Sequence, residues 1–495
     1  MTDQSIFPDP VYQDTVLSPL FDGAKTHFAA SLRAINQAHL IMLAEQGILT
    51  RDAARSIGSA LNAIDTDVDV TALTYTGEHE DYFFLVEAAL RKRLGPDLGG
   101  ALHTARSRND MDHTVFKMVL RDKADDLMDL TQALATTILE TAEREAATLI
   151  VAYTHGQPAQ PTTFGHYLHA VADVLLRDMA RLSAARDVLD QCPMGAAAIT
   201  TTGFPIDRAR VADLLGFETP TANSYGSIAS VDYITGLYSA VKLTCLHLGR
   251  VVQDLQFWTA FEVGQLYVPN SLVQISSIMP QKRNPVPIEH MRHLASVACG
   301  RCDMVVNTMH NTPFTDMNDS EGEVQVAGYG AFDSAGRMLS LMATLIPAMR
   351  VRADKVRANM DRACVTITEL ADTLVRDEGL SFRQAHEIAA ATARDVIARS
   401  VPLADGFNTF AAAFQAATGR ASALDPEAFA DAVSPEAFVA RRTIPGGPGP
   451  AALADALASA NATVAGLRAT AQARQTHIAA CDTMRTQSFA KLLET

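Results

Sequence analysis

A short loop past the middle of the chain gathers polar side chains that a helical core would exclude. It reads SSIMPQKRNP over residues 276–285 and holds hydroxyls, cations and amides between two prolines. Hydroxyl and amide donors beside cations can hold a carboxylate or stabilise a developing anion. The composition alone fits a solvated surface loop equally well, so both interpretations stand at this point.

A second polar segment, HTARSRND over residues 103–110, stands at a predicted helix start. An arginine beside serine and asparagine at a helix N-terminus offers a guanidinium fork, side-chain donors and free backbone N–H groups. Together these groups suit a carboxylate. The alternative is a capped helix with exposed arginines.

A third segment, YTHGQPAQPTTFGH over residues 153–166, contains His155, and a lone histidine is more often structural than catalytic. His166 and His169 have the i, i+3 spacing of a metal-binding pair, but no acidic third ligand stands nearby. We therefore interpret both as packing residues and predict no metal site.

All three segments resemble strings of the aspartase/fumarase superfamily. The loop resembles its G-S-S-x-M-P-x-K-x-N-P sequence. The other two segments resemble the H-T-G-R-S-R-N-D and T-H-x-Q-x-A-Q-P-x-T-F-G-H strings of argininosuccinate lyases, with Ala105 in place of a glycine. Residues 365–386, the VSPE of residues 433–436 and Gly446-Gly447 resemble argininosuccinate lyases in particular. The matches span roughly residues 35–460.

The resemblance implies a stepwise anti elimination without cofactor or metal, on a small anionic substrate. A base removes a C–H proton beside a carboxylate, the resulting aci-carboxylate dianion is stabilised by fixed donors, and the C–N bond then breaks. In the family, the first serine of the loop is the base. By this resemblance Ser276 is the base, Lys282 and Asn284 stabilise the aci-carboxylate, and His155 is the proton donor with Glu289 as its partner. The residues of the fumarate clamp are Ser107, Arg108, Asn109 and Thr154. Ser277 and Met279 are further substrate contacts.

The resemblance also implies an assembly. Members of the superfamily are homotetramers whose long helices form a twenty-helix bundle, and each active site gathers segments from three chains. We therefore expect the clamp, the Thr154–His155 segment and the Ser276 loop to meet from different subunits.

Several family features are missing. Ile275 replaces the glycine before the two serines, Phe83 stands where the family has a histidine, and Val231 replaces the arginine of S-D-R-D-F. Argininosuccinate lyases carry Y-N-[RK]-D-L-Q-E-D-K-E after the loop helix, and its Tyr, Gln and Lys hold the amino-acid end of the arginine. Here residues 315–323 read TDMNDSEGE, without Tyr, Gln or Lys. The lost lysine removes a carboxylate partner.

The sequence therefore predicts a lyase that splits fumarate from an N-substituted L-aspartate whose leaving amine is not arginine. Relatives that cleave aminopolycarboxylates, such as ethylenediamine-N,N′-disuccinate lyase, show that a similar scaffold accepts diamines. The acidic residues of the changed segment would suit a cationic amine, or they form a solvated acidic turn; they are Asp316, Asp319, Glu321 and Glu323. The rivals are an ordinary argininosuccinate lyase and, in another class, a non-catalytic homologue like some lens crystallins. A cycloisomerase or an adenylosuccinate lyase fits less well.

Helical periodicity dominates the elements that must position these residues. From Ile234 to Leu255, apolar residues recur in alternating steps of four and three over three heptads, which predicts a long helix in a bundle. A second such seam carries Leu127, Leu130, Leu134 and Ile138. Strand patterns are almost absent. We predict an all-α fold with an N-terminal helical domain (1–108), a central long-helix bundle (109–365) with its catalytic loop at about 268–287, and a small C-terminal helical domain (366–495).

The composition of the chain limits the classes of partner that we expect it to bind. The formal net charge of −15 argues against nucleic-acid and anionic membrane surfaces. Six scattered cysteines and the absence of a secretory signal pattern predict a cytoplasmic protein. Cys299 and Cys302 form a lone C-x-x-C in a helical stretch, which we interpret as two small buried thiols rather than a metal site.

Overall fold

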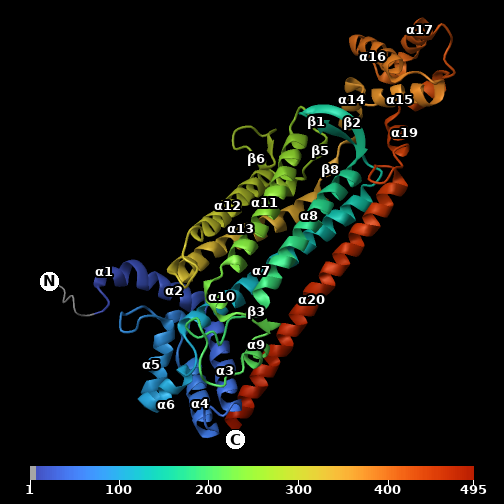
Figure 1. Ribbon diagram of the computed structural model, residues 1–495. Coiled ribbons are helices and arrows are strands. Elements are labelled where there is room, and N and C mark those ends of the chain that lie inside the picture. Colours follow the sequence, from blue (N-terminus) through green and yellow to red (C-terminus); the bar gives the residue numbers. More distant parts are fainter. Residues whose placement is uncertain (1–6, 495) are drawn as a thin grey trace.

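The structure is a computed structural model that describes residues 7–494, and it is helical almost throughout (Figure 1). Long helices running along one axis form a central bundle. Their bounds are α7 Arg108–Arg144, α8 Phe164–Asp187, α11 Asp232–Thr259, α12 Val286–Thr308 and α13 Gly322–Ala348. The predicted all-α fold with a long central bundle is confirmed.

The core of the bundle forms where the periodicity predicted it. On α11, every seam position from Ile234 to Leu255 is at most 2% exposed. Burial of one such aliphatic side chain contributes about 1.5–3 kcal/mol. The seam on α7 is buried at Leu127, Leu134 and Ile138, but Leu130 is 37% exposed. That face of α7 therefore remains open in the single chain.

Helices of the N-terminal region lie at the end of the bundle where α7 begins (Figure 1). They are α1 Pro10–Tyr12, α2 Ser18–His27, α3 Ala29–Glu45, α4 Arg51–Asp67, α5 Tyr82–Leu94 and α6 Pro96–Gly100, with single-turn helices η1 Gln13–Leu17, η2 Val70–Ala72 and η3 Ala101–His103. Leu40, Ile57 and other buried residues of this region belong to the same hydrophobic cluster as the bundle. The region is therefore anchored to the bundle through a shared core.

A small helical domain stands at the opposite end (Figure 1). It comprises α14 Ala353–Ala363, α15 Ile367–Glu378, α16 Phe382–Arg399, η7 Leu403–Gly406, α17 Phe407–Thr418, α18 Pro426–Ala432 and α19 Pro435–Ala440. It has its own core, in which Phe410 stacks on Phe429 with ring centroids 4.9 Å apart.

The last helix departs from the predicted third domain. Helix α20, Pro450–Glu494, leaves the small domain and packs along α7 and α8 back to α3 and α4. It does so through a narrow stripe of buried residues, Leu453, Leu457, Ala460 and Val464, spaced four, three and four apart. So narrow a stripe, set among alanines and polar residues, does not by itself predict a helix that packs along a bundle.

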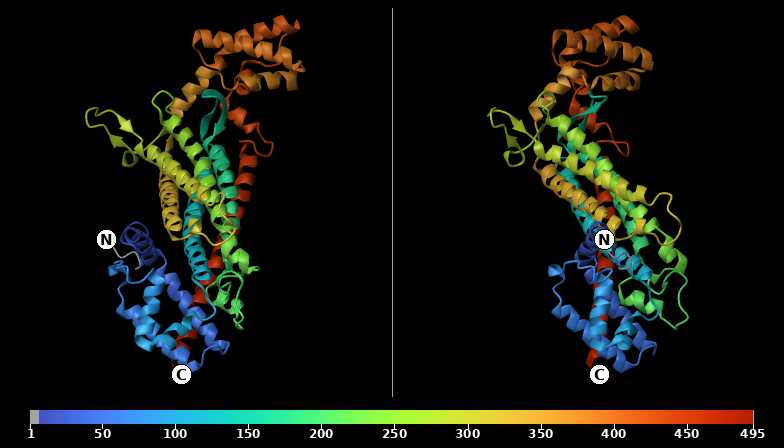
Figure 2. Two further views of the ribbon diagram at one scale, coloured as in Figure 1. Left: turned by 60° about the vertical axis from the view of Figure 1, so that its left-hand side comes forward. Right: turned by 90° about the vertical axis from the view of Figure 1, so that its left-hand side faces the viewer.

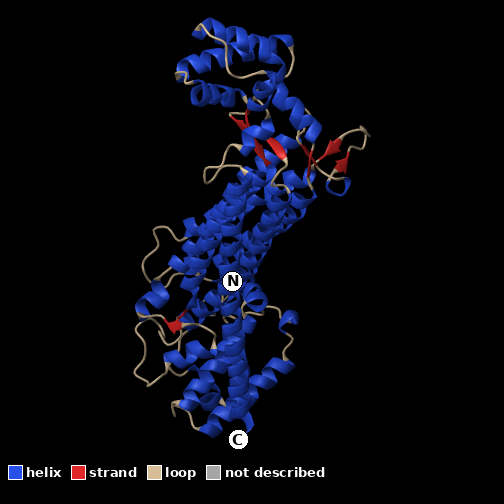
Figure 3. Cartoon of the chain, turned by 90° about the vertical axis from the view of Figure 1, so that its right-hand side faces the viewer, coloured by secondary structure: helices blue, strands red, loops and turns tan. Residues whose placement is uncertain are grey.

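Short strands lie near the ends of the bundle (Figure 3). They pair as β1 Leu149–Thr154 with β2 Gln157–Thr163, β3 Gln191–Cys192 with β4 Thr219–Pro220, β5 Leu266–Tyr267 with β8 Arg350–Val351, and β6 Gln274–Ile275 with β7 Arg283–Asn284. Between the long helices lie the short elements η4 Val188–Asp190, α9 Arg208–Leu214, α10 Ser224–Ala229, η5 Asn270–Leu272 and η6 Asn318–Ser320.

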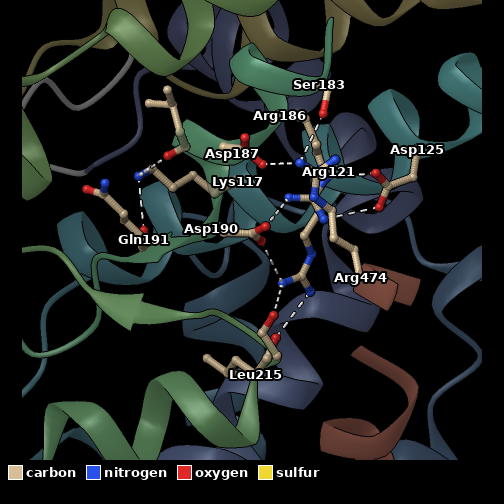
Figure 4. Close-up of polar contacts among 12 residues, drawn as sticks. Lys117, Arg121, Asp125, Ser183, Arg186, Asp187, Asp190, Gln191, Leu215 and Arg474 are labelled. Atoms are coloured by element: carbon tan, nitrogen blue, oxygen red, sulfur yellow. Dashed lines mark hydrogen bonds and ion pairs between the residues drawn. The ribbon is translucent and has the colours of Figure 1, made fainter. Parts of the chain in front are cut away.

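A network of buried charges fastens α8 to α7 (Figure 4). The fully buried Arg186 donates to both oxygens of Asp125 at 2.8 and 3.1 Å, and its Nη1 lies 2.6 Å from Asp190 Oδ2. Arg121 donates to the carbonyl oxygens of Leu215 and Gly216 at 3.1 and 2.8 Å. Since an unpaired buried charge is strongly unfavourable, this network fixes the chain beyond α8 in place.

Helices that could cross a membrane are not found within residues 7–494. Both cysteines of the C-x-x-C are free thiols on α12: Cys302 is buried and Cys299 half-buried. His166 contacts Thr162 Oγ1 at 2.8 Å and the Gly446 carbonyl oxygen at 3.0 Å, so it links the β1–β2 hairpin to the loop before α20.

Candidate functional site

The predicted clamp forms the N-terminus of α7. Ser107 is the N-cap residue, and its hydroxyl accepts a hydrogen bond from Asn109 N. Asp110 completes the capping box by accepting from Ser107 N at 2.9 Å. Its other oxygen accepts from the backbone of Gly195 and Ala197, both at 2.9 Å. Burial raises the pKa of Asp110 to about 6. These bonds hold the start of α7 against residues 195–197.

Arg108 is engaged within its own chain. Its guanidinium lies 2.8 Å from Asp81 and 3.0 Å from Glu80, and it is 38% exposed. A substrate carboxylate would have to compete with two protein carboxylates for this side chain. Ser107 and Asn109, half-buried beside it, are the neutral members of the clamp.

Carboxylates gather around the first turns of α7. Asp112 lies one turn beyond Arg108, and Asp316 and Glu321 reach the same place from the loop before α13. Burial raises the pKa of Asp112 well above its ordinary value, and the charges of Glu321, Asp81 and Asp316 add to the shift. Burial likewise raises the pKa of Glu321, with a further contribution from Asp316. Of the four acids noted in residues 315–323, Asp316 and Glu321 therefore face the clamp, whereas Glu323 is exposed.

Sequence reasoning missed Asp112 and its neighbour His113. The available signal was their spacing, because Arg108 and Asp112 are separated by four residues and so share a face of the helix. His113 is 1% exposed and lies 3.5 Å from Asp316, joining the changed loop to α7.

Thr154 and His155 lie at the tip of the β1–β2 hairpin and are exposed. His155 and Gly156 form the two-residue turn, with φ angles of +53° and +73°. Left-handed backbone at a non-glycine residue costs about 1–2 kcal/mol, so this histidine is presented in a constrained conformation. Within residues 7–494, no hydrogen bond or ion pair of its side chain is found.

The Ser276 loop is a β-hairpin that projects from the side of the bundle before α12 (Figure 2). β6 pairs with β7, so that Gln274 faces Asn284. Ser276 and Lys282 flank the hairpin turn, and Lys282 N donates to Met279 O at 2.9 Å. Ser277, Met279 and Lys282 are exposed.

The Ser276 hydroxyl is the acceptor of two backbone hydrogen bonds. The N–H groups of Met279 and Ile278 donate to its Oγ at 3.1 and 3.4 Å. Donors aimed at one oxygen favour its deprotonated form. These two bonds form a local turn that fixes the Ser276 side chain.

A single chain does not bring these segments together. The clamp stands at the start of α7, whereas the β1–β2 hairpin follows its end, and 37 residues of helix separate them. At a rise of ~1.5 Å per residue, that distance is ~55 Å. The Ser276 loop lies at the same end of the bundle as the β1–β2 hairpin (Figure 1). Glu289 is exposed in the first turn of α12, which follows this loop. Between residues 7 and 494, no cluster of three potential metal ligands is found.

Comparison with known proteins places these features in a family. A family model described as lyase matches residues 24–300, and one described as argininosuccinate lyase C-terminal matches residues 364–440. A protein named argininosuccinate lyase 2 from Agrobacterium fabrum (strain C58) is 58% identical over 97% of this chain and 95% of its own length. Argininosuccinate lyase 1 from Shouchella clausii is 34% identical over 91% of each chain.

Among solved structures, that of EDDS lyase in complex with formate has a TM-score of 0.85 and 26% identity, covering 98% of this chain and 96% of the other. The full-length matches and the fold lead to one assignment. The chain belongs to the argininosuccinate lyase family of the aspartase/fumarase superfamily and is a carbon–nitrogen lyase that releases fumarate.

Proposed function

We propose that this enzyme releases fumarate from an N-substituted L-aspartate by anti elimination, and that its leaving amine is not arginine. The observation that carries the proposal is the remodelled segment 315–323, which lacks the Tyr, Gln and Lys of its family and brings carboxylates to the clamp. In argininosuccinate lyases, this Tyr, Gln and Lys hold the amino-acid end of the arginine. Without the lysine, the α-carboxylate of arginine loses a cationic partner.

In the proposed mechanism, Ser276 removes the proton beside the substrate carboxylate. A serine is a weak base unless its alkoxide is stabilised, and the two backbone N–H groups that reach its Oγ supply part of that stabilisation. Closure of the projecting hairpin over substrate would exclude water and strengthen these interactions.

Lys282 and Asn284 then stabilise the aci-carboxylate, while Ser107, Asn109 and Thr154, with Ser277 and Met279, hold the fumarate half. Arg108 joins the clamp only if a substrate carboxylate displaces Asp81 or Glu80. His155 delivers a proton to the departing nitrogen, with Glu289 as its carboxylate partner. This division of roles follows the family pattern on the matching positions.

We further propose a homotetramer in which three chains build each site. The ~55 Å between clamp and hairpin supports this assembly, because no motion within one chain closes such a gap along a rigid helix. An open groove of about 980 Å3 between α7, α12 and α13 also supports it. Leu130, which is 37% exposed, and the half-buried Leu341 line the groove, and a second copy would cover these apolar side chains.

The second candidate is argininosuccinate cleavage. It is favoured by the 58% identity to a protein named argininosuccinate lyase 2. The remodelled segment 315–323 of this chain argues against arginine as the leaving amine. A non-catalytic, crystallin-like role is disfavoured because Ser276, Lys282, Asn284 and His155 are all present.

Fumarate release from purified protein distinguishes these functions. We expect no measurable absorbance change with argininosuccinate and a steady increase with an aspartate N-substituted by another amine, such as ethylenediamine or an aminopolycarboxylate. Rapid cleavage of argininosuccinate would show that the remodelled segment still accepts arginine.

A further inference from the structure

His113 is a buried histidine of the clamp helix that the proposed chemistry does not use. Its ring is 1% exposed, and its Nδ1 lies 3.1 Å from the hydroxyl oxygen of Tyr233, which is also 1% exposed on α11. On the other side of the ring, Nε2 lies 3.5 Å from Oδ1 of Asp316. Among the described residues, neither of these two atoms has a hydrogen-bond partner.

Either group can be the donor in the contact between His113 and Tyr233, and one of the two arrangements also connects the ring to Asp316. When the Tyr233 hydroxyl donates to Nδ1, the neutral ring carries its proton on Nε2, which faces Asp316. The Nε2–H group then faces one carboxylate oxygen of Asp316 at 3.5 Å, which is an electrostatic contact rather than a hydrogen bond, and the Asp316 side chain is 26% exposed. His113 can therefore hold Asp316 in place without neutralising it.

The surroundings of Asp316 are rich in acidic side chains. Asp112, Glu321, Asp81 and Glu80 lie at the same end of α7, and the nearby cation is Arg108, which already pairs with Asp81 and Glu80. Clustered carboxylates repel one another, so a bound cation would be favoured by all of them.

An aromatic pair is close to Asp316 in the chain. Phe314, two residues before Asp316, stacks on Tyr225 of α10 with ring centroids 6.0 Å apart. Their exposed fractions are 65% and 44%. Aromatic faces beside carboxylates suit an alkylammonium group better than a carboxylate.

We propose that Asp316 receives a second positive charge on the leaving amine, and that His113, fixed by Tyr233, is the positioning residue that orients it. The inference rests on the proposed function and narrows its substrate class. The preferred substrate is the mono-N-succinyl derivative of a diamine, with a protonated far nitrogen and no carboxylate beside it. A diamine substituted at both nitrogens would lose that charge pairing and bring a second carboxylate group into an acidic site.

The test uses two amines of nearly equal shape added to fumarate by the full-length enzyme. Ethylenediamine has a terminal ammonium where propylamine has a methyl group. Because the two amines differ in basicity, each KM is expressed as the concentration of the form that carries one unprotonated nitrogen. On that scale we expect the wild-type enzyme to show a KM for ethylenediamine at least about tenfold lower than for propylamine, as for a hydrogen bond to a charged group. The isosteric Asp316→Asn change should bring the two KM values together while leaving the KM for fumarate unchanged.

A positioning role for His113 predicts a split between kinetic constants. His113→Phe should raise the KM for ethylenediamine by several-fold, with little change in kcat and none in the KM for propylamine. Asp173→Asn, an exposed change on α8, is the matched control and should alter none of these constants.

The outcomes distinguish a failure of this inference from a failure of the proposed function. Equal KM values for the two amines in the wild type, or an unchanged ratio in Asp316→Asn, would overturn the cation site while leaving a non-arginine lyase in place. Turnover with arginine and with neither small amine would contradict the proposed function itself. The wild-type ratio requires no variant, so a failure of Asp316→Asn to fold does not remove the test.

Discussion

At the residue scale, the proposed chemistry depends on the state of the Ser276 hydroxyl. Replacing Ser276 with alanine removes the base and should lower kcat by about 10²–10⁴-fold, the usual contribution of a positioned base. Initial rates of fumarate release measure the effect, and circular dichroism confirms that the fold is kept. Ser277→Ala is the neighbouring control and should lose much less activity. An unchanged rate in Ser276→Ala would exclude this residue as the base.

Lys117 provides a residue-scale prediction about pH. It is 4% exposed on α7, donates to Gln191 O at 3.0 Å, and lies 5.0 Å from the centre of the Tyr233 ring. Burial lowers its pKa from 10.5 to about 8. The folded protein thus binds this proton more weakly than the unfolded chain. The resulting penalty is complete below about pH 8 and disappears as the pH rises to about 10.5.

Lys117→Met removes this penalty, so the comparison with wild type isolates it from other titrating groups. Thermal melts at matched protein concentration should show that the variant loses, between pH 8 and 10, about 2 kcal/mol of its advantage over wild type. Parallel pH profiles for the two proteins would refute a depressed Lys117 pKa.

The sequence predicted those features of the site whose residues are close together in the chain. The Ser276 loop and the cap at Ser107 are contiguous strings, so their residue types and spacing were readable. The pairing of Arg108 with Glu80 and Asp81, and of His113 with Asp316, joins residues far apart in the chain. Only the packing of the helices brings such residues together, so the sequence pattern could not reveal these contacts.

At the element scale, α8 is held by a buried charge cluster rather than by apolar contacts alone. Removing Arg186 leaves Asp125 and Asp190 without their main partner, so Arg186→Met should reduce the free energy of unfolding by about 3–5 kcal/mol. Urea denaturation at fixed protein concentration measures the loss.

Arg177 on the same helix provides a matched comparison. Its pairing with Asp173 is half exposed, at 54% and 55%, so Arg177→Met should change stability by no more than about 1 kcal/mol. Similar losses in the two variants would mean that burial of the Arg186 cluster does not determine its contribution.

Two elements show where sequence patterns failed. The β1–β2 hairpin turns on His155-Gly156, which lacks the Asn-Gly or Asp-Gly pair that usually marks such a turn. Helix α20 presents a one-residue-wide stripe whose partner surface lies more than 300 residues earlier, on α7. The long α11 seam succeeded because its own period is enough to define a bundle helix.

At the scale of the whole molecule, shared active sites predict complementation between inactive variants. In the proposed tetramer, a site takes Ser276 from one chain and Asn109 from another, so Ser276→Ala and Asn109→Ala subunits, each inactive alone, would form intact sites together. Denaturing and refolding the two as an equal mixture should restore about a quarter of wild-type activity, as random assembly of a closed symmetric oligomer gives.

Each variant refolded alone is the control for that experiment. A mixture no more active than its components, while size-exclusion chromatography shows mixed oligomers, would mean that one chain builds its own site.

Addition of amines to fumarate, followed by loss of fumarate absorbance, tests the central claim most directly. The acids at the start of α7 and the loss of Tyr, Gln and Lys from residues 315–323 predict turnover with ethylenediamine or another diamine and none with arginine. Arginine as the preferred amine would contradict this account and make the enzyme an argininosuccinate lyase with an atypical amine end.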